Sequence, residues 1–437
     1  MRIYPSKANG EMLCPPSKSM AHRNLICAAL AEGKSIIRNV DFSEDIKATL
    51  SCIKELGAQY TIENNTVTIR GNPGFALQSQ GQDHTPAQSQ AQGQTQVQVQ
   101  AHSASQTLNF NCNESGSTLR FFIPLAMLQD KPSVFSGSQV LMTRPLSVYE
   151  KICQSQGIKL EQKEGKVYLQ GKLHAADFEI PGNISSQFIT GLLFTLPLLN
   201  ADSKIILTES IESKPYIDMT LQVQKDFGIE AAWINENTLL VKGNQKYKNT
   251  DTYVEGDYSN AAFFEALNTL GGKVKIMGLR EDSLQGDKVY LPYFNALCKD
   301  FARLDISDCP DLGPVLFVVA AAHNGGEFTG TKRLAIKESN RGQVMCQELA
   351  KFGIKTLQEE NRIVIYKSEL KRPEEVLQGH NDHRIVMSLA TLLTLTGGRI
   401  EGISAVKKSL PDYFKRIKNL GIKFDYDIEG ESDGMDK

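Results

Sequence analysis

One hydrophobic and polar pattern recurs along this chain. An amphipathic stretch ends in an apolar residue and a glycine, and a short extended run, a polar turn and a second extended run follow it. Five copies are readable, with their glycines at Gly57, Gly157, Gly228, Gly353 and Gly421. A glycine directly after the last apolar residue is typical of a helix C-terminus. The pattern therefore predicts five helices that end at these glycines, the first four of them followed closely by a hairpin.

The spacing of the glycines predicts repeated units. Gly228 follows Gly157 by 71 residues and Gly421 follows Gly353 by 68, whereas Gly157 follows Gly57 by 100. The glutamine-rich tract 78–106 accounts for the difference, so we interpret it as an insertion that forms a mobile surface loop. Between Gly228 and Gly353 there is room for a weak sixth copy around residues 297–306. Each unit contains both a helical and a strand periodicity of apolar residues. Six such units indicate an α/β fold that is divided into two groups of three.

Composition narrows the class of protein. The 437 residues include 48 Lys and Arg against 50 Asp and Glu, a net charge of −2 that argues against a non-specific nucleic-acid binder. The longest apolar runs, 188–199 and 386–395, are shorter than the roughly 20 residues that a bilayer-spanning helix needs. The 8 cysteines form no CxxC pair, and residues 1–5 show no apolar leader. We expect a cytoplasmic protein with no membrane partner, no nucleic-acid partner and a disordered acidic tail at 429–437.

Four polar helix starts in the first part of the chain are candidate anion sites. Ser17-Lys18-Ser19, with Arg23 one turn later, precedes a helical stretch, and Ser115-Gly116-Ser117 and Ser185-Ser186-Gln187 precede apolar ones. Arg144 stands directly before Pro145, at the start of a fourth predicted helix. Free N–H groups and the helix dipole favour an anion at such a position. Each start, taken singly, is also consistent with an ordinary capped surface helix.

The second part of the chain carries charged counterparts. They are Asp311 before an apolar helix, Lys337-Glu338 with Arg341, Asn381 to Arg384, and Lys408 before Pro411. Each cluster alone is consistent with a cap or a solvated charged face. Together, cations from both parts suit a cleft that holds two small anionic substrates, because Arg matches phosphate and carboxylate bidentately. Asp311 and Glu338 are the carboxylates that could transfer protons there.

These motifs, in this order, resemble the enolpyruvyl transferases over nearly the whole chain, and within that family the branch that acts on shikimate 3-phosphate. The more specific matches include Ser213-Lys214-Pro215-Tyr216, Val254 to Asp257 and Gln285-Gly286-Asp287. The resemblance implies a two-domain inside-out α/β barrel, in which each domain has three repeated units with helices inside and sheets outside. The implied domains are 15–253, and 1–14 plus 254–428.

The implied reaction moves the enolpyruvyl group of phosphoenolpyruvate to the 5-hydroxyl of shikimate 3-phosphate and releases phosphate by addition and elimination. The resemblance implies a reaction that needs no cofactor and no metal, and we expect a monomer. Cations split between two domains repel one another until a polyanion joins them, so we expect shikimate 3-phosphate to drive closure. It assigns Asp311 as the acceptor of the hydroxyl proton, Glu338 as the acid and base at the methylene carbon, and Lys18 as the cation that stabilises the departing phosphate.

The resemblance also implies two groups of binding residues. The shikimate 3-phosphate group comprises Lys18, Ser19, Arg23, Ser185, Ser186, Gln187, Ser213, Tyr216, Asp311 and Lys337. The phosphoenolpyruvate group comprises Lys18, Gly116, Arg144, Gln187, Arg341, Arg384 and Lys408.

Three departures from the family pattern bear on affinity. Glu114 stands where the family usually has an amide, and we expect it to be paired with Arg120. Arg333 stands where an Asn often contacts the shikimate phosphate, and Asn340 replaces an acid before Arg341. Gly116, by contrast, matches the family pattern. A larger side chain at this position would crowd phosphoenolpyruvate and glyphosate, so we expect the protein to be sensitive to glyphosate.

Two alternative functions remain open at this point. The sister enzyme that acts on UDP-N-acetylglucosamine shares the fold, but it typically carries a reactive Cys where this chain has Gln139. A non-catalytic protein that binds a phosphorylated metabolite would have no need of both Asp311 and Glu338.

Overall fold

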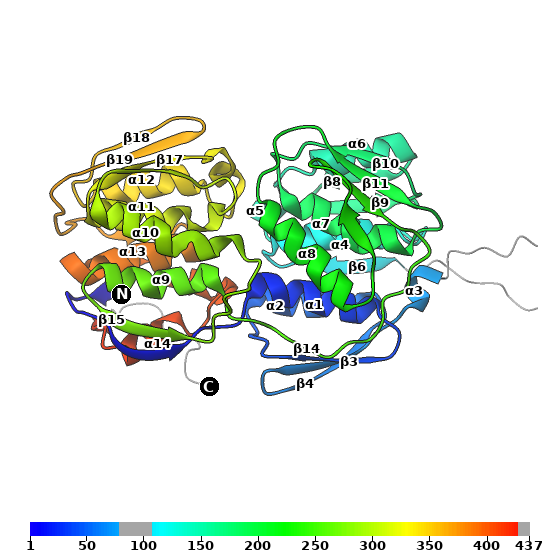
Figure 1. Cartoon of the computed structure of the whole chain (residues 1–437), viewed down its shortest axis with the longest axis horizontal. Coiled ribbons are helices and arrows are strands. Elements are labelled where there is room, and N and C mark those ends of the chain that lie inside the picture. Colours follow the sequence, from blue (N-terminus) through cyan, green and yellow to red (C-terminus); the bar gives the residue numbers. More distant parts are fainter. Residues whose placement is uncertain (78–106, 427–437) are drawn as a thin grey trace, which may run out of the picture.

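A computed structural model describes residues 1–77 and 107–426. The predicted insertion 78–106 and the predicted tail 429–437 lie outside these residues. Figure 1 shows two globular halves side by side, with labelled helices stacked in the middle of each half and strands toward its outside. The first half holds one hydrophobic core built from residues between 21 and 254, and the second half holds another built from residues 1–14 and 258–424.

One unit of the first half illustrates the repeat. Its elements are β6 (Leu108–Asn111), α4 (Gly116–Ala126), β7 (Ser133–Ser136), α6 (Ser147–Gln156), β8 (Lys159–Lys163) and β9 (Lys166–Gln170). β6 lies parallel to β7, and β7 is antiparallel to β9, which forms a hairpin with β8. Phe135 pairs with Val167 across β7 and β9, and both side chains are fully buried.

Four other sheets have the same arrangement of one parallel pair followed by two antiparallel pairs. In the first half they are β14 (Thr252–Tyr253), β3 (Lys34–Arg38), β5 (Thr66–Arg70) and β4 (Gln59–Glu63), and β10 (Asp177–Ile180), β11 (Ser203–Leu207), β13 (Thr238–Val241) and β12 (Ala231–Trp233). In the second half they are β16 (Ala302–Asp305), β17 (Gly325–Thr329), β19 (Arg362–Tyr366) and β18 (Thr356–Gln358), and β20 (Leu377–Gln378), β21 (Gly398–Glu401), β1 (Arg2–Ile3) and β22 (Phe424–Asp425).

The sixth unit differs from its predicted place. Around residues 297–306 the chain forms β16, but β16 pairs with β17 and so belongs to the sheet of the Gly353 hairpin. The sixth sheet has two strands, β15 (Lys273–Met277) and β2 (Asn9–Leu13), which are parallel. The prediction was wrong because the partner strand of β15 comes from the N-terminus, which no local pattern reveals.

The five repeat glycines take the predicted positions. Gly157 ends α6 with φ 68, a left-handed conformation that glycine adopts without steric cost. Gly57, Gly228, Gly353 and Gly421 also have positive φ, and they follow α2 (Glu44–Glu55), α8 (Lys214–Asp226), α12 (Arg341–Ala350) and α14 (Tyr413–Asn419). The helix ends predicted from the repeat pattern are confirmed.

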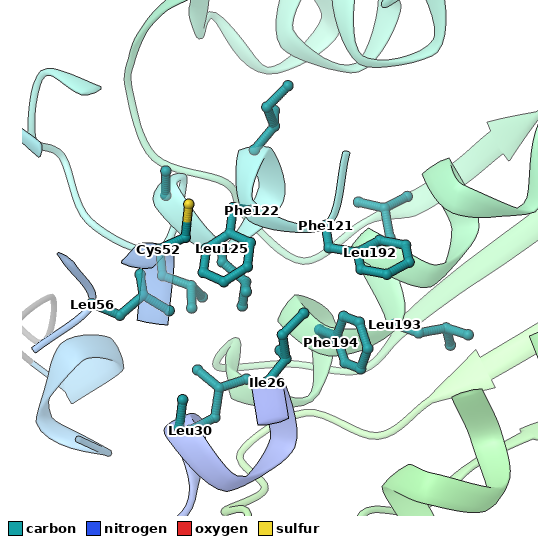
Figure 2. Packing of buried hydrophobic residues seen from close by; sticks show 14 of the residues in the cluster. Ile26, Leu30, Cys52, Leu56, Phe121, Phe122, Leu125, Leu192, Leu193 and Phe194 are labelled. Carbon is teal, nitrogen blue, oxygen red and sulfur yellow. The ribbon is translucent and has the colours of Figure 1, made fainter. Parts of the chain in front are cut away.

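The inner helices are buried on nearly all sides. α11 (Gly313–Ala322) reads GPVLFVVAAA, and a helix that is apolar all round must be surrounded by protein. In the first half, α1 (Lys18–Leu30), α4 and α7 (Ser186–Thr195) enclose the core shown in Figure 2, where the rings of Phe121 and Phe194 meet edge to face at 5.5 Å. Helices inside and sheets outside give the inside-out α/β arrangement.

The chain passes between the halves near residues 14–16 and near 254–256. β1 pairs with β21 and β22 of the second half, whereas β14 pairs with β3 of the first. Across the two connections, Pro16 and Gly256 form an isolated antiparallel bridge. In residues 1–77 and 107–426, no helix has the length and apolar character that a membrane crossing requires.

Candidate active site

Helix N-termini of both halves point at one cleft. Ser17, Ser115 and Ser185 cap α1, α4 and α7, and each side-chain oxygen accepts a backbone N–H of the first turn. On the opposite wall, Asn340 and Asp382 cap α12 and α13 (His383–Thr396) in the same way. The three serines and Asp382 were predicted at helix starts, and the structure confirms that each lies there. The capping role of Asn340 was not predicted.

The cleft brings together nearly all predicted site residues. Those that line it are Lys18, Ser19, Arg23, Gly116, Arg144, Ser185, Ser186, Gln187, Ser213, Tyr216, Asp311, Lys337, Glu338, Arg341 and Arg384. Lys408 is the exception: its neighbour Ser409 lines the cleft, but its own ammonium contacts Glu114 and the Asn381 carbonyl. The structure therefore places Lys408, a predicted phosphoenolpyruvate ligand, close to the cleft but not in its wall.

The first half contributes cations that are held by neutral groups. Arg23 donates to the Thr220 hydroxyl at 2.9 Å, to the Ser19 carbonyl at 2.7 Å and to the Tyr216 carbonyl at 2.9 Å. No ion pair of Arg23 is described, and burial lowers its pKa to about 10. Because these partners are uncharged, the positive charge of Arg23 is available to an incoming anion.

A second chain of neutral contacts orients an amide toward the cleft. Arg120 donates to Gln187 Oε1 at 2.6 Å, and Gln187 Nε2 donates to the Ser117 hydroxyl at 3.0 Å. Arg120 also lies over the ring of Phe188, with 4.9 Å to its centroid. These contacts fix which end of the Gln187 amide faces which neighbour.

Lys18 links the two halves at the base of the cleft. Its ammonium pairs with Asp45 of α2 at 2.8 Å, and its backbone N–H donates to Asp257 Oδ2 of the second half at 3.1 Å. Burial alone would lower the pKa of Lys18, but Asp45 and Glu338 outweigh it and the pKa is raised. Lys18 is thus fully protonated at neutral pH.

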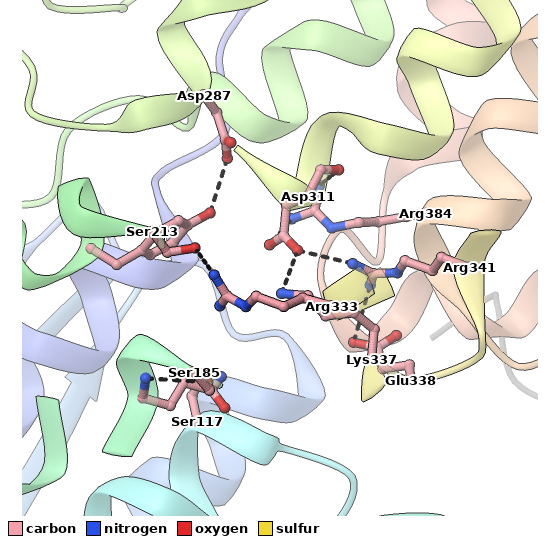
Figure 3. A network of polar contacts seen from close by, with 12 residues as sticks. Ser117, Ser185, Ser213, Asp287, Asp311, Arg333, Lys337, Glu338, Arg341 and Arg384 are labelled. Atoms are coloured by element: carbon pink, nitrogen blue, oxygen red, sulfur yellow. Dashed lines mark hydrogen bonds and ion pairs between the residues drawn. The ribbon is translucent and has the colours of Figure 1, made fainter. Parts of the chain in front are cut away.

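Asp311 is the centre of an ion cluster on the second half (Figure 3). Its carboxylate lies 2.9 Å from Arg341 Nη1, 3.0 Å from Arg384 Nη2 and 3.2 Å from Lys337 Nζ. Burial would raise the pKa of Asp311, but the three cations hold it well below its usual range. Asp311 is therefore ionised and can accept a proton.

Glu338 lies beside Asp311 in the same cluster but with different partners. Glu338 Oε2 is 2.8 Å from His383 Nδ1, and Glu338 Oε1 is 3.8 Å from Arg341 Nη2. Burial would raise the pKa of Glu338, whereas His383, Arg341 and Lys18 lower it well below its ordinary value. Burial also lowers the pKa of His383, although Glu338 opposes that shift.

Two further groups have pKa values near neutrality. Burial lowers the pKa of Lys337 to about 8. The positive charges of Arg333 and Arg341 lower it as well, whereas Asp311 opposes the shift. Burial and the negative charge of Asp311 raise the pKa of Asp287 to about 7, and Asp287 accepts a hydrogen bond from the Tyr216 hydroxyl at 3.2 Å. Groups that titrate near pH 7 inside a cleft are typical of functional sites.

Glu338, Asp382 and His383 place three potential ligand atoms within 4.8 Å of one another. Arg341 Nε is already 2.8 Å from Asp382 Oδ2, and Arg384 and Lys18 carry further positive charge next to this group. A divalent cation at this position would face a guanidinium within bonding distance of the same carboxylate. The residues present therefore fit a guanidinium better than a metal.

Two of the unusual residues have partners that were not predicted. Glu114 is paired, as predicted, but with Lys408 and with the Asn381 amide at 3.3 Å, whereas Arg120 is turned to Gln187. The prediction chose the wrong partner because Arg120 lies near in sequence, while Lys408 reaches Glu114 only through the meeting of the halves. Arg333 reaches across the same gap and donates to the Ser213 hydroxyl at 2.6 Å, with Glu212 at 3.6 Å.

Sequence reasoning gave no role to three buried or nearly buried acids of the cleft wall. Asp257 and Asp287 lie in motifs that were recognised, Val254 to Asp257 and Gln285 to Asp287, so a signal existed. Asp45 is one more acid of an amphipathic helix, and no sequence pattern distinguishes it. Its pairing with Lys18 follows only from the packing of α1 against α2.

Known proteins are similar to this chain in sequence and in fold. The family model for EPSP synthase (3-phosphoshikimate 1-carboxyvinyltransferase) matches residues 4–95 and 76–417. A 3-phosphoshikimate 1-carboxyvinyltransferase of Clostridium beijerinckii is 41% identical over 97% of this chain and 98% of its own length. The corresponding protein of Clostridioides difficile is 39% identical over 97% of this chain and 98% of its own length.

The fold has a solved counterpart. A structure of EPSP synthase from Acinetobacter baumannii superimposes with a TM-score of 0.71 at 22% sequence identity and covers 97% of this chain and 98% of that one. This likeness establishes the fold, whereas the family model and the clostridial relatives extend to the sequence of the cleft. The chain therefore belongs to the EPSP synthase family, the 3-phosphoshikimate 1-carboxyvinyltransferases.

Proposed function

We propose that the chain transfers the enolpyruvyl group of phosphoenolpyruvate to the 5-hydroxyl of shikimate 3-phosphate, giving 5-enolpyruvylshikimate 3-phosphate and phosphate. The observation that carries this proposal is that the two walls of the cleft, one from each half of the protein, offer complementary groups. One wall offers hydroxyls, an amide and cations to bound anions. The other wall holds Asp311 and Glu338, two ionised carboxylates with different partners, within the same cleft.

Binding roles follow from charge and position. The hydroxyls of Ser19, Ser185, Ser186 and Ser213, with Arg23, Gln187, Tyr216 and Lys337, would hold shikimate 3-phosphate. Lys18, Gly116, Gln187, Arg144, Arg341, Arg384 and Lys408 would hold phosphoenolpyruvate. The neutral partners of Arg23 support the first assignment, because no acid among the residues that the structure describes forms an ion pair with it.

Asp311 would accept the proton of the 5-hydroxyl as its oxygen attacks C2 of phosphoenolpyruvate. Its low pKa means that it is ionised at neutral pH, and the cations around it stabilise charge that develops on the attacking oxygen. A substrate anion would draw Arg341 or Lys337 from Asp311 and so raise its basicity. Binding of the second substrate would thereby prepare the base.

Glu338 would deliver a proton to the methylene carbon and later remove one from the resulting methyl group, while Lys18 stabilises the phosphate that leaves. The cations that lower the pKa of Glu338 include Lys18 and Arg341. Negative charge from phosphoenolpyruvate at those cations would raise the pKa of Glu338 toward neutrality. Glu338 could then act as an acid in the loaded cleft, as the addition step needs.

Contacts across the cleft support closure as part of the cycle. Ser213 N donates to the Ser307 carbonyl at 3.2 Å, and Lys214 N donates to Asp308 Oδ1 at 3.1 Å. A closed cleft excludes water and strengthens its electrostatic interactions. We propose that shikimate 3-phosphate favours this closed form, and small-angle scattering without compaction on adding that ligand would contradict the proposal.

We also propose a domain organisation, an oligomeric state and a location for the protein. Domains of 15–253, and of 1–14 plus 254–428, are supported by the two separate hydrophobic cores. We propose a cytoplasmic monomer whose partners are these two small substrates, with neither nucleic acid nor membrane. The net charge of −2 supports the absence of a nucleic-acid partner.

The test is phosphate release from phosphoenolpyruvate with shikimate 3-phosphate, with UDP-N-acetylglucosamine, and with no acceptor. The proposal requires release that depends on shikimate 3-phosphate and that is lost in Glu338→Gln. Release that depends on UDP-N-acetylglucosamine would assign the sister activity. No release by folded protein that binds shikimate 3-phosphate would indicate a metabolite-binding protein.

A further inference from the structure

The pairing of Glu114 with Lys408 joins the two halves at the rim of the cleft. Glu114 precedes α4 of the first half, and Lys408 ends the 3-10 helix at Ile403–Lys408 of the second. Asn381 holds both members, since its amide donates to Glu114 at 3.3 Å and its carbonyl accepts from Lys408 at 2.5 Å. The three residues form one polar contact between segments separated by 267 positions in the sequence.

The backbone that carries Glu114 is fixed from its own side. Asn113 N donates to Asn111 Oδ1 at 3.0 Å, Ser138 N donates to the Asn113 carbonyl at 2.7 Å, and Ser115 is the N-cap of α4. Gly116, two residues after Glu114, lies in the cleft wall. The Glu114 carboxylate is thus held close to the predicted site of phosphoenolpyruvate.

Lys408 has one acidic partner among the ion pairs described for residues 1–77 and 107–426, and that partner is Glu114. The Lys408 side chain is 9% exposed and the Glu114 side chain is 28% exposed. Water therefore reaches the carboxylate more readily than the ammonium. Separating the pair leaves Glu114 able to regain hydration, whereas the buried Lys408 needs another anion.

We infer that Glu114 is an internal counter-ion that competes with phosphoenolpyruvate for Lys408 and so sets the affinity of the cleft for its carboxylated, phosphorylated substrate. This inference rests on the proposed function, because it takes Lys408 to be a phosphoenolpyruvate ligand. A substrate anion must either displace Glu114 from Lys408 or share the ammonium with it. In both cases the negative charge of Glu114 weakens binding of this substrate and leaves the shikimate site unaffected.

The first test compares Glu114→Gln with Glu63→Gln, a change at an exposed acid of β4. Glutamine keeps the shape of the side chain and removes its charge. We expect Glu114→Gln to lower the KM for phosphoenolpyruvate by about fivefold, the effect of one half-exposed charge, with the KM for shikimate 3-phosphate changed less than about twofold. Glu63→Gln should leave both constants unchanged.

A double-mutant cycle tests the competition itself. Lys408→Met should raise the KM for phosphoenolpyruvate more in the Glu114→Gln background than in the unmodified protein, because the free ammonium contributes more than the paired one. Equal effects in both backgrounds would overturn the inference. An unchanged or increased KM for phosphoenolpyruvate in Glu114→Gln would overturn it as well.

The control for the proposed function is separate. If the unmodified protein releases phosphate only with shikimate 3-phosphate, the activity stands whatever Glu114 does. If it does not turn over at all, the proposed function fails first. Glu114→Asp, which retains the charge, should restore a KM nearer to that of the unmodified protein than Glu114→Gln does, and a purely structural role would not give that order.

Discussion

The two walls of the cleft satisfy their charged groups in different ways. On the first half, Arg23 and Arg120 are held by hydroxyl, carbonyl and amide oxygens, and Asp45 is the one acid among the described lining residues of that wall. On the second half, Asp311, Glu338 and Asp382 interlock with Arg341, Arg384, Lys337 and His383. The first wall keeps positive charge available for substrate anions, whereas the second has its cations partly neutralised by its own carboxylates.

This difference separates binding from proton transfer. Neutral partners fix an Arg in place without cancelling its charge, which suits recognition of phosphate. Interlocked ion pairs hold carboxylates in fixed positions and keep them ionised until a substrate changes the local charge. Substitutions in the two walls should therefore have different effects.

The largest difference should appear in turnover. We expect Glu338→Gln to lower kcat by about 10²- to 10⁴-fold, the range for loss of a general acid and base, with binding of shikimate 3-phosphate retained. Ser186→Ala in the first wall should instead raise the KM for shikimate 3-phosphate and leave kcat within a few-fold. Steady-state kinetics and calorimetric titration of shikimate 3-phosphate measure the two effects. Comparable losses of kcat in both variants would contradict the division.

Stability should distinguish the walls next. Arg341→Ala leaves Asp382, which is 0% exposed, without its guanidinium partner, and loss of one member of a buried pair costs about 3–5 kcal/mol. Arg144→Ala in the first wall removes a cation for which no ion pair is described, so we expect a change below about 1 kcal/mol. Urea unfolding of both variants measures this. Equal midpoints for the two would contradict the account.

Gly116 tests how closely the first wall fits its ligand. A Cβ at this position would lie 2.7 Å from Arg144 Nη1, so Gly116→Ala must move that guanidinium while leaving the backbone in place. We expect micromolar glyphosate to inhibit the unmodified protein. In Gly116→Ala, the KM for phosphoenolpyruvate should rise and glyphosate inhibition should weaken, each by about ten- to hundredfold. Inhibition of both proteins at the same concentration would refute this prediction.

The smallest expected effect is the pH dependence of shikimate 3-phosphate binding, which tests the charged wall of the second half. Lys337 has a pKa of about 8, below the ordinary value for lysine, so it carries its charge below that pH and loses it above. If it holds shikimate 3-phosphate, the KM for that substrate should rise above pH 8, by up to about tenfold per pH unit. Lys337→Arg, which stays protonated, should flatten the profile. A profile that is identical in the two proteins would exclude Lys337 as the titrating group.

The sequence predicted the repeat architecture and most of the cleft, because both are written in local patterns. Gly57, Gly157 and Ser185 are recognisable where they stand, since helix ends and caps have local residue preferences. The sixth sheet was misplaced because β2 and β15 lie more than 250 positions apart. Strand pairing between such distant segments depends on the tertiary arrangement of the whole chain, which no local pattern predicts.

Partners across the cleft were also beyond local inference. Glu114 was expected to pair with Arg120, six positions away, but it pairs with Lys408 of the other half. Asp45 and its contact with Lys18 gave no signal, because an acid on an amphipathic helix is ordinary. Charge pairing between the halves can be recognised only when the arrangement of the two halves in space is known.

The most direct test of the proposed mechanism measures hydrogen exchange at the methylene carbon of the transferred enolpyruvyl group. If Glu338 adds a proton to this carbon and later removes one from the resulting methyl group, solvent deuterium must enter the methylene group of the product when the reaction runs in D₂O. Proton and deuterium NMR of the product measures this. We expect deuterium in that methylene group with the unmodified protein and no such incorporation with Glu338→Gln. Product formed in D₂O without deuterium in the methylene group would contradict the addition and elimination that the cleft is proposed to perform.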